Sequence, residues 1–272
     1  MNLHHFLYEQ ALAKDAPPAS DSKEWRAAVD YYRREMIAKD LRQHLGELNL
    51  ALSRCNSDQS LKGSGVSTAV AATLEAAAPE YRAGLWKQHN QGNIAWIESV
   101  KPLLAKHGAA LAKELARIYQ TEWPSEPIRV DVSEYASWAG AYTTLRPTHI
   151  TISSTDPGYR GPAALEMLFH EASHSLIDKL DDALAAELKK QNRLFKRRGF
   201  SHAVLFYTAG ELTRRRIDGY TMYGIKNGVF ENGWAESVPV LEKDWKPYID
   251  GKIDLATAVR RLVEDYGVPR TP

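Results

Sequence analysis

The chain of 272 residues is long enough to bury a substantial hydrophobic core, as one large domain or as two smaller ones. Hydrophobic residues make up 44% and charged residues 25% of the chain, which excludes global intrinsic disorder. Lysine and arginine number 35 against 34 aspartate and glutamate residues. This balance gives no overall electrostatic reason to bind nucleic acid or an acidic membrane.

Cysteine content and hydropathy exclude further classes of protein. The single cysteine, Cys55, excludes an internal disulfide framework and a multi-cysteine zinc or iron–sulfur site. No apolar run reaches the roughly 18 residues that indicate a transmembrane helix. The first residues lack the basic start and the apolar stretch of a signal peptide, so we expect a soluble, cytoplasmic protein. A signal peptide removed before residue 1 would instead indicate a secreted or periplasmic protein.

Residues 1–125 predict an N-terminal helical region. Apolar side chains recur at helical spacing over three stretches, residues 25–53, 67–91 and 94–119. The second stretch is interrupted near Pro79, and Pro124 and Pro127 end the helical pattern. We interpret the apolar positions as the core of a helical bundle.

The remaining region, residues 126–272, begins with β-prone segments and continues with helices. The segments cover residues 128–132, 138–145 and 149–153, and they predict a small, mostly antiparallel sheet. In the last segment, Ile150 and Ile152 alternate with polar residues, as in a half-buried strand. Helices are predicted over residues 163–180, 183–198, 201–217 and 255–266, with a loop over residues 220–230. The fold class that follows is helix-rich α+β.

The motif that carries chemistry is His170-Glu171-Ala172-Ser173-His174, which has the pattern HExxH and lies in a strongly helical segment. Residues four apart lie on the same face of a helix, so both imidazoles can bind one metal ion at about 2.0–2.1 Å. Glu171 lies about 100° further around the helix, where it can reach a metal-activated water without being a ligand. This arrangement predicts metal-dependent hydrolysis with Glu171 as general base.

The motif helix and the β-prone segment before it resemble the zincin metallopeptidases, and among them the gluzincins. The resemblance covers residues 128–217 and implies a sheet next to the motif helix, one zinc ion per chain and a peptide or protein substrate. It also implies a third ligand that is a glutamate on a later helix. The metzincin pattern is excluded, because Ile177 and Leu180 stand where it requires glycine and histidine.

The third ligand has several candidates, namely His202, Glu187, Glu211, Glu231 and Glu236. We favour Glu211, because small residues beside it would let its helix approach the motif helix closely. Glu211 also lies 37 residues after His174, which leaves room for one intervening helix. His202 is the second choice, at the start of the same predicted helix. Two imidazoles and one carboxylate favour zinc over magnesium or calcium.

The sequence offers more than one candidate for the donors to the oxyanion and for the residue that supports the first histidine. Tyr220 and Tyr223, in the loop after the predicted ligand helix, are preferred as donors to the developing oxyanion because loop residues can close on a substrate. Many gluzincins carry an aspartate four residues after the third ligand, but Arg215 stands there. Asp178 or Asp218 could support the first histidine instead.

We expect residues 138–142 to form an edge strand for peptide backbone, with Gly140 permitting close approach. The glutamate-bearing strand motif of the exopeptidase gluzincins is absent, so the sequence favours an endopeptidase.

Two alternatives stay open. One is a zincin-fold protein that binds metal, cleaves no peptide and acts as a binding or regulatory module. The other is a helical interaction protein that binds an anionic partner through its basic residues, over 189–198 and 214–216. We interpret those basic residues as solvated helix faces, so we expect no nucleic-acid or membrane partner. The sequence indicates no particular oligomeric state.

Overall fold

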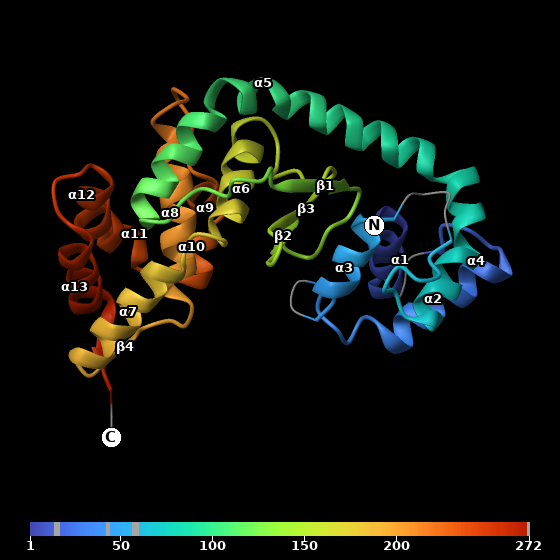
Figure 1. The fold of residues 1–272 in the computed structure, drawn as a ribbon, viewed down its shortest axis with the longest axis horizontal. Helices are drawn as coiled ribbons and strands as arrows, with labels where there is room; N and C mark the ends of the chain where they lie inside the picture. The colour runs from blue at the N-terminus through green and yellow to red at the C-terminus, as the bar shows by residue number, and fades with distance from the viewer. Residues whose placement is uncertain (14–16, 42–43, 56–59, 271–272) are drawn as a thin grey trace. The chain divides into compact units, whose positions relative to one another are not determined.

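The computed structural model describes residues 1–13, 17–41, 44–55 and 60–270. It shows a helix-rich α+β protein with a small mixed sheet (Figure 1), which confirms the predicted class. The chain forms two units, the first from Met1–Ser99 with Ile128–Tyr159 and the second from Val100–Pro127 with Arg160–Pro272. Among the described residues, no helix has both the length and the hydropathy to cross a membrane.

The described residues of the first unit form four helices and the start of a fifth. They are α1 (Asn2–Leu12), α2 (Lys23–Glu35), α3 (Gly46–Ser53), α4 (Thr68–Gly84) and α5 (Trp86–Tyr119), which continues into the second unit. Ser22 caps α2 by accepting a hydrogen bond from the backbone of Trp25, whose indole is fully buried. The helical stretch predicted over residues 25–53 is divided between α2 and α3. A turn after α2 brings Met36 and Leu41 into the core before α3 begins.

The sheet of the first unit has the strand order β1-β3-β2, with β1 (Arg129–Ser133), β2 (Ala141–Thr144) and β3 (His149–Ser153). β3 pairs with β1 in parallel and with β2 in antiparallel orientation, so the sheet is mixed rather than mostly antiparallel. All five residues of β3 are buried, because it is the central strand. The expectation that it is half-buried is therefore wrong.

The division predicted at residue 125 does not coincide with the two units. The sheet belongs to the unit of the N-terminal helices, whereas the motif helix belongs to the other unit. The reason lies in packing, since β1 contacts α1 directly and Asn93 of α5 accepts a hydrogen bond from Ser154 at 2.6 Å.

Gly140, which precedes β2, has a φ of +75°. A Cβ atom there would overlap the carboxylate of Asp156 and lie 2.7 Å from the ring of Tyr159. The close approach that Gly140 permits is therefore to its own chain.

We expect Gly140→Ala to lower the free energy of unfolding by about 1–3 kcal/mol, from backbone strain and overlap combined. Chemical denaturation followed by circular dichroism measures the loss. Gly63→Ala is the matched control, because Gly63 also has a positive φ, of +78°, but no atom within 4 Å of the added methyl group. Equal losses in the two variants would show that overlap at Gly140 contributes nothing.

The second unit is built from short helices around a buried centre. Its elements after α5 are α6 (Pro162–Ser173), α7 (Asp178–Lys190), β4 (Arg193–Phe195), α8 (Phe200–Arg214), α9 (Tyr223–Lys226), α10 (Val229–Gly233), α11 (Ser237–Val240), the π-helical turn η1 (Leu241–Trp245), α12 (Lys246–Ile249), α13 (Leu255–Tyr266) and β5 (Gly267–Pro269). Phe200, Trp245 and Tyr266 are among its fully buried side chains. The predicted last helix, residues 255–266, is confirmed as α13, which Asp254 caps.

Two predicted helices of this unit end at least seven residues before their predicted last residue. The helix expected over residues 163–180 ends at Ser173, where the Ser173 hydroxyl bonds the carbonyl of Phe169 and the Ser175 hydroxyl bonds that of Ala172. Only the first half of the helix expected over residues 183–198 is helical, because it forms the last part of α7, which begins at Asp178 and ends at Lys190. Strand β4 follows it and pairs with β5 in antiparallel orientation.

Candidate metal centre

The HExxH motif lies at the C-terminal end of α6, which packs directly against α8 (Figure 1). His170 and Glu171 are 1% and 6% exposed, and His174 directly follows the last residue of the helix. His202 lies in the first turn of α8. The contact between the two helices therefore brings His202 to the motif histidines.

The three histidines converge on one point. One ring nitrogen of each lies within 4.8 Å of those of the other two, and the Nε2 atoms of His170 and His202 are 3.0 Å apart. Two nitrogens bound to the same tetrahedral zinc ion at about 2.0–2.1 Å would lie roughly 3.3 Å apart. The donor set and its spacing therefore fit one metal ion.

The surroundings of His170 and His174 keep both motif imidazoles neutral, which is the form that binds a metal. Burial lowers the pKa of His170 well below its usual value, and the neighbouring His202 and His174 lower it further. Burial also lowers the pKa of His174 to about 4. Phe206, one turn after His202, stacks on the ring of His170 with 3.8 Å between ring centroids, and Trp234 meets His202 edge-on.

Glu211, the favoured third ligand in the sequence analysis, does not lie at this point. Its carboxylate is 2% exposed and accepts hydrogen bonds from the Nε atoms of Arg214 and Arg215, each at 2.7 Å. His202 and Glu211 are nine residues apart on α8, which separates them by about 13.5 Å and half a turn of helix. The helix that carries His202 to the motif therefore turns Glu211 away from it.

The other predicted third ligands lie outside the cluster as well. Glu187 pairs with Lys190 on α7, Glu236 pairs with Lys196, and Glu231 is exposed on α10. Among the described residues, the cluster that could hold a metal ion consists of His170, His174 and His202.

The two tyrosines predicted to stabilise an oxyanion lie next to the motif helix but face different partners. The hydroxyl of Tyr220 donates a hydrogen bond of 2.7 Å to Oε2 of Glu166, and the backbone N–H of Tyr223 donates one of 3.0 Å to the same oxygen. The ring of Tyr223 stacks against Phe206, which itself covers His170. The oxyanion role stays a prediction for both, and the hydrogen bond to Glu166 holds the Tyr220 hydroxyl.

Glu166 is a residue that the sequence analysis did not single out. It is fully buried on α6, four residues before His170. Burial raises the pKa of Glu166 to about 7, against the lowering effect of the hydrogen bonds from Tyr220 and Tyr223. A glutamate one turn before the first motif histidine, inside an otherwise apolar segment, is the sequence pattern that could have revealed it.

Two further predictions concern the surroundings of the motif. Asp178 and Asp218, considered as supports for the first histidine, are both exposed. The predicted edge strand over residues 138–142 is present only from Ala141 onward, and Trp138 in the preceding loop is 73% exposed.

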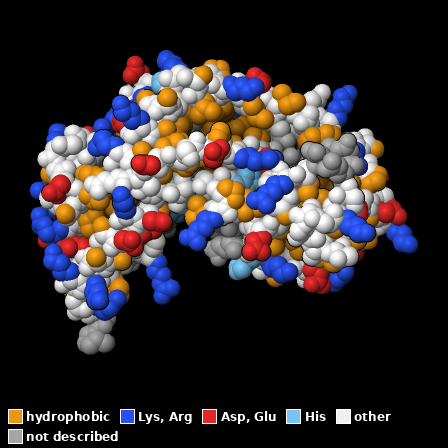
Figure 2. Space-filling view, in the orientation of Figure 1, with side chains coloured by type: hydrophobic (Ala, Val, Ile, Leu, Met, Phe, Trp, Pro, Cys, Tyr) orange, Lys and Arg blue, Asp and Glu red, His pale blue; other side chains and the backbone are white. Residues whose placement is uncertain are grey.

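The basic residues near α7 and α8 are largely engaged within the chain. Lys196 pairs with Glu236 at 2.9 Å, and Arg216 pairs with Glu114. Figure 2 shows blue basic and red acidic side chains interspersed over the displayed face rather than segregated. These pairs indicate solvated helix faces more than one continuous cationic surface.

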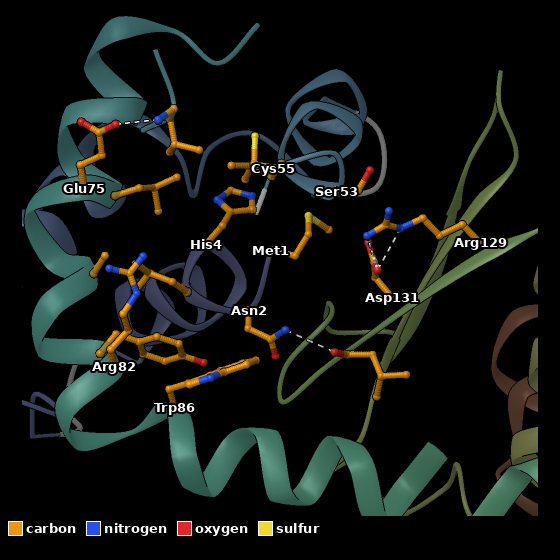
Figure 3. A pocket seen from close by; sticks show the side chains of 17 residues that line it. Met1, Asn2, His4, Ser53, Cys55, Glu75, Arg82, Trp86, Arg129 and Asp131 are labelled. Atoms are coloured by element: carbon orange, nitrogen blue, oxygen red, sulfur yellow. Dashed lines mark hydrogen bonds and ion pairs between the residues drawn. The ribbon is translucent and has the colours of Figure 1, made fainter. Parts of the chain in front are cut away.

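The first unit contains a separate cavity of about 340 Å³ (Figure 3). Arg129 and Asp131 of β1 pair with each other on one side of it, and Glu75 of α4, on the other side, accepts a hydrogen bond from the backbone of Leu61. Polar side chains, among them His4 and Arg82, and apolar side chains, among them Trp86, form the rest of the lining. The motif histidines do not line this cavity.

Searches against protein-family models, curated proteins and solved structures found no match to this chain.

Proposed function

We propose that this protein is a zinc-dependent hydrolase that cleaves peptide bonds. Within that class, we propose an endopeptidase of the zincin type. The observation that carries the proposal is the convergence of His202 with both histidines of an HExxH motif. In this proposal His170, His174 and His202 hold one zinc ion per chain, and Glu171 is the general base.

Three imidazole ligands suit zinc better than magnesium or calcium, which prefer oxygen ligands. Bound zinc would supply the Lewis acid that lowers the pKa of a water molecule and polarises the scissile carbonyl. Glu171, next to His170 on α6, takes the proton of the attacking water and delivers it to the leaving amine. Phe206 and Trp234 line the histidines with apolar surface, which limits the access of bulk water to the site.

The proposal is tested with Glu171→Gln. We expect the variant to retain zinc, because Glu171 is not a ligand, and to lose about 10²–10⁴-fold in the rate of peptide cleavage. Zinc content is measured by plasma mass spectrometry, and cleavage by mass spectrometry of a degenerate peptide library. Glu231→Gln is the matched control, because Glu231 is exposed on α10.

The result also separates the proposal from its alternative. A wild-type protein that binds zinc but cleaves no peptide of the library would contradict hydrolysis and support a zincin-like module that only binds metal. Equal cleavage by wild type and Glu171→Gln would contradict the role of Glu171.

A further inference from the structure

Two buried polar atoms on the motif helix have no hydrogen-bond partner within the described part of the chain. They are Oε1 of Glu166 and Nδ1 of His170. The two residues are four apart on α6, so their side chains lie on the same face, one turn of helix from each other. Because buried polar groups are nearly always paired, two unpaired atoms at neighbouring positions call for a common explanation.

The chemistry of the two atoms is complementary once a metal is bound. A histidine that binds zinc through Nε2 keeps its proton on Nδ1, which then needs an acceptor. Nε2 of His170 is the nitrogen that faces His202, at 3.0 Å. Its Nδ1 is therefore the donor, and an ionised carboxylate one turn away is a suitable acceptor.

The second carboxylate oxygen of Glu166, Oε2, makes contacts that fix the orientation of the carboxylate. Oε2 accepts hydrogen bonds from the Tyr220 hydroxyl and the Tyr223 backbone, which leaves Oε1 for a further donor. The segment that supplies these donors is itself fixed on α8, because Met222 lies against Gly210, where a Cβ atom would come within 2.8 Å of the Met222 sulfur.

We propose that Glu166 is the positioning residue of the metal centre, with Oε1 accepting the Nδ1–H hydrogen bond of His170 when zinc is bound. The inference rests on the zinc site proposed above. It links the first metal ligand to the segment carrying Tyr220 and Tyr223 through a single carboxylate. It also assigns to Glu166 the supporting role that the sequence analysis left open between Asp178 and Asp218.

The test compares Glu166→Gln with Tyr220→Phe. Glutamine has the size of glutamate but only one acceptor oxygen, so it cannot serve both the Tyr220–Tyr223 segment and His170. We expect Glu166→Gln to weaken zinc binding 10–100-fold, as measured by competition with a chromophoric chelator. Tyr220→Phe removes a donor to Oε2 and leaves Oε1 in place, so we expect its zinc affinity to stay within about threefold of wild type.

A second readout reports the hydrogen bond directly. In zinc-loaded protein labelled with ¹⁵N-histidine, long-range ¹H–¹⁵N spectra should show a slowly exchanging Nδ1–H proton that disappears in Glu166→Gln. Circular dichroism establishes that each variant is folded.

Unchanged zinc affinity in Glu166→Gln, with the Nδ1–H signal retained, would overturn the inference and leave the zinc site standing. Equal weakening in Tyr220→Phe would show that Glu166 acts through the tyrosine segment, which also overturns it. A wild-type protein that binds no zinc would overturn the proposed function and this inference together. Failure of peptide cleavage alone would not affect the zinc measurements.

Discussion

Zinc binding is expected to be lost in His202→Ala and retained in Glu211→Gln. His202 contributes one of the three nitrogens that converge within 4.8 Å, so its removal leaves an incomplete set of ligands. We expect the zinc affinity to fall by more than the roughly 100-fold that loss of an outer hydrogen-bond partner can cost. Glu211 is engaged by Arg214 and Arg215, and its replacement should leave the metal content unchanged.

Glu211→Gln should instead affect the stability of the fold. The carboxylate is buried, but the side chains of Arg214 and Arg215 are 39% and 32% exposed, so solvent screens part of the ion-pair energy. We expect a loss of about 1–2 kcal/mol in the free energy of unfolding.

Plasma mass spectrometry of both variants, purified without added metal, measures the zinc content, and chemical denaturation measures the stability. Zinc retained in His202→Ala and lost in Glu211→Gln would reverse our assignment and restore the glutamate ligand that the sequence favours.

The first unit is expected to lose stability as the pH falls below about 6.5, and His5 should account for a measurable share of that loss. His5 is fully buried in α1, where its Nε2 atom lies 2.7 Å from the hydroxyl of Tyr142. Burial lowers the pKa of His5 to about 3. In the unfolded chain, histidine titrates near pH 6.5.

The sign of the effect follows from these two values. Above about pH 6.5 the imidazole is neutral in both states, so its contribution to stability is fully present. Between about pH 6.5 and pH 3 the unfolded state binds a proton that the folded state does not, so the free energy of unfolding falls with the pH. For one histidine, the slope is about 1.4 kcal/mol per pH unit.

The measurement compares wild type with His5→Gln by chemical denaturation between pH 7.5 and pH 4.5. We expect wild type to be the more stable at pH 7.5 and the difference to shrink as the pH falls, because the variant lacks the titrating group. His44→Gln is the control, since His44 is an exposed histidine of the same unit. A difference between wild type and His5→Gln that stays constant with pH would contradict the prediction.

Local sequence patterns predicted several parts of this protein correctly. The HExxH spacing lies at the end of a helix and brings His170 and His174 together, because residues four apart share a helix face wherever that helix packs. Residues 149–153 and 255–266 form a strand and a helix with the predicted bounds. In each case, the secondary structure depends mainly on residues that lie within a few positions along the chain.

The third member of the histidine cluster could not be predicted in this way. His202 and Glu211 both lie on α8, and either could approach α6 as far as the helical pattern of α8 is concerned. The small residues beside Glu211 do indicate close packing, but the atoms nearest to the position of an added Cβ at Gly210 belong to Met222. The choice between the two ligands depends on which face of α8 contacts α6.

Sequence alone therefore determined the class of fold, the two motif histidines and the candidate general base Glu171. Tertiary structure decided that His202 completes the cluster, that the sheet belongs with the N-terminal helices, and that Glu166 is buried beside His170. The physical reason is the range of the interactions involved. Helix periodicity and capping act over a few residues, whereas the packing of α6 on α8 joins surfaces whose relative rotation is fixed only when the whole core is assembled.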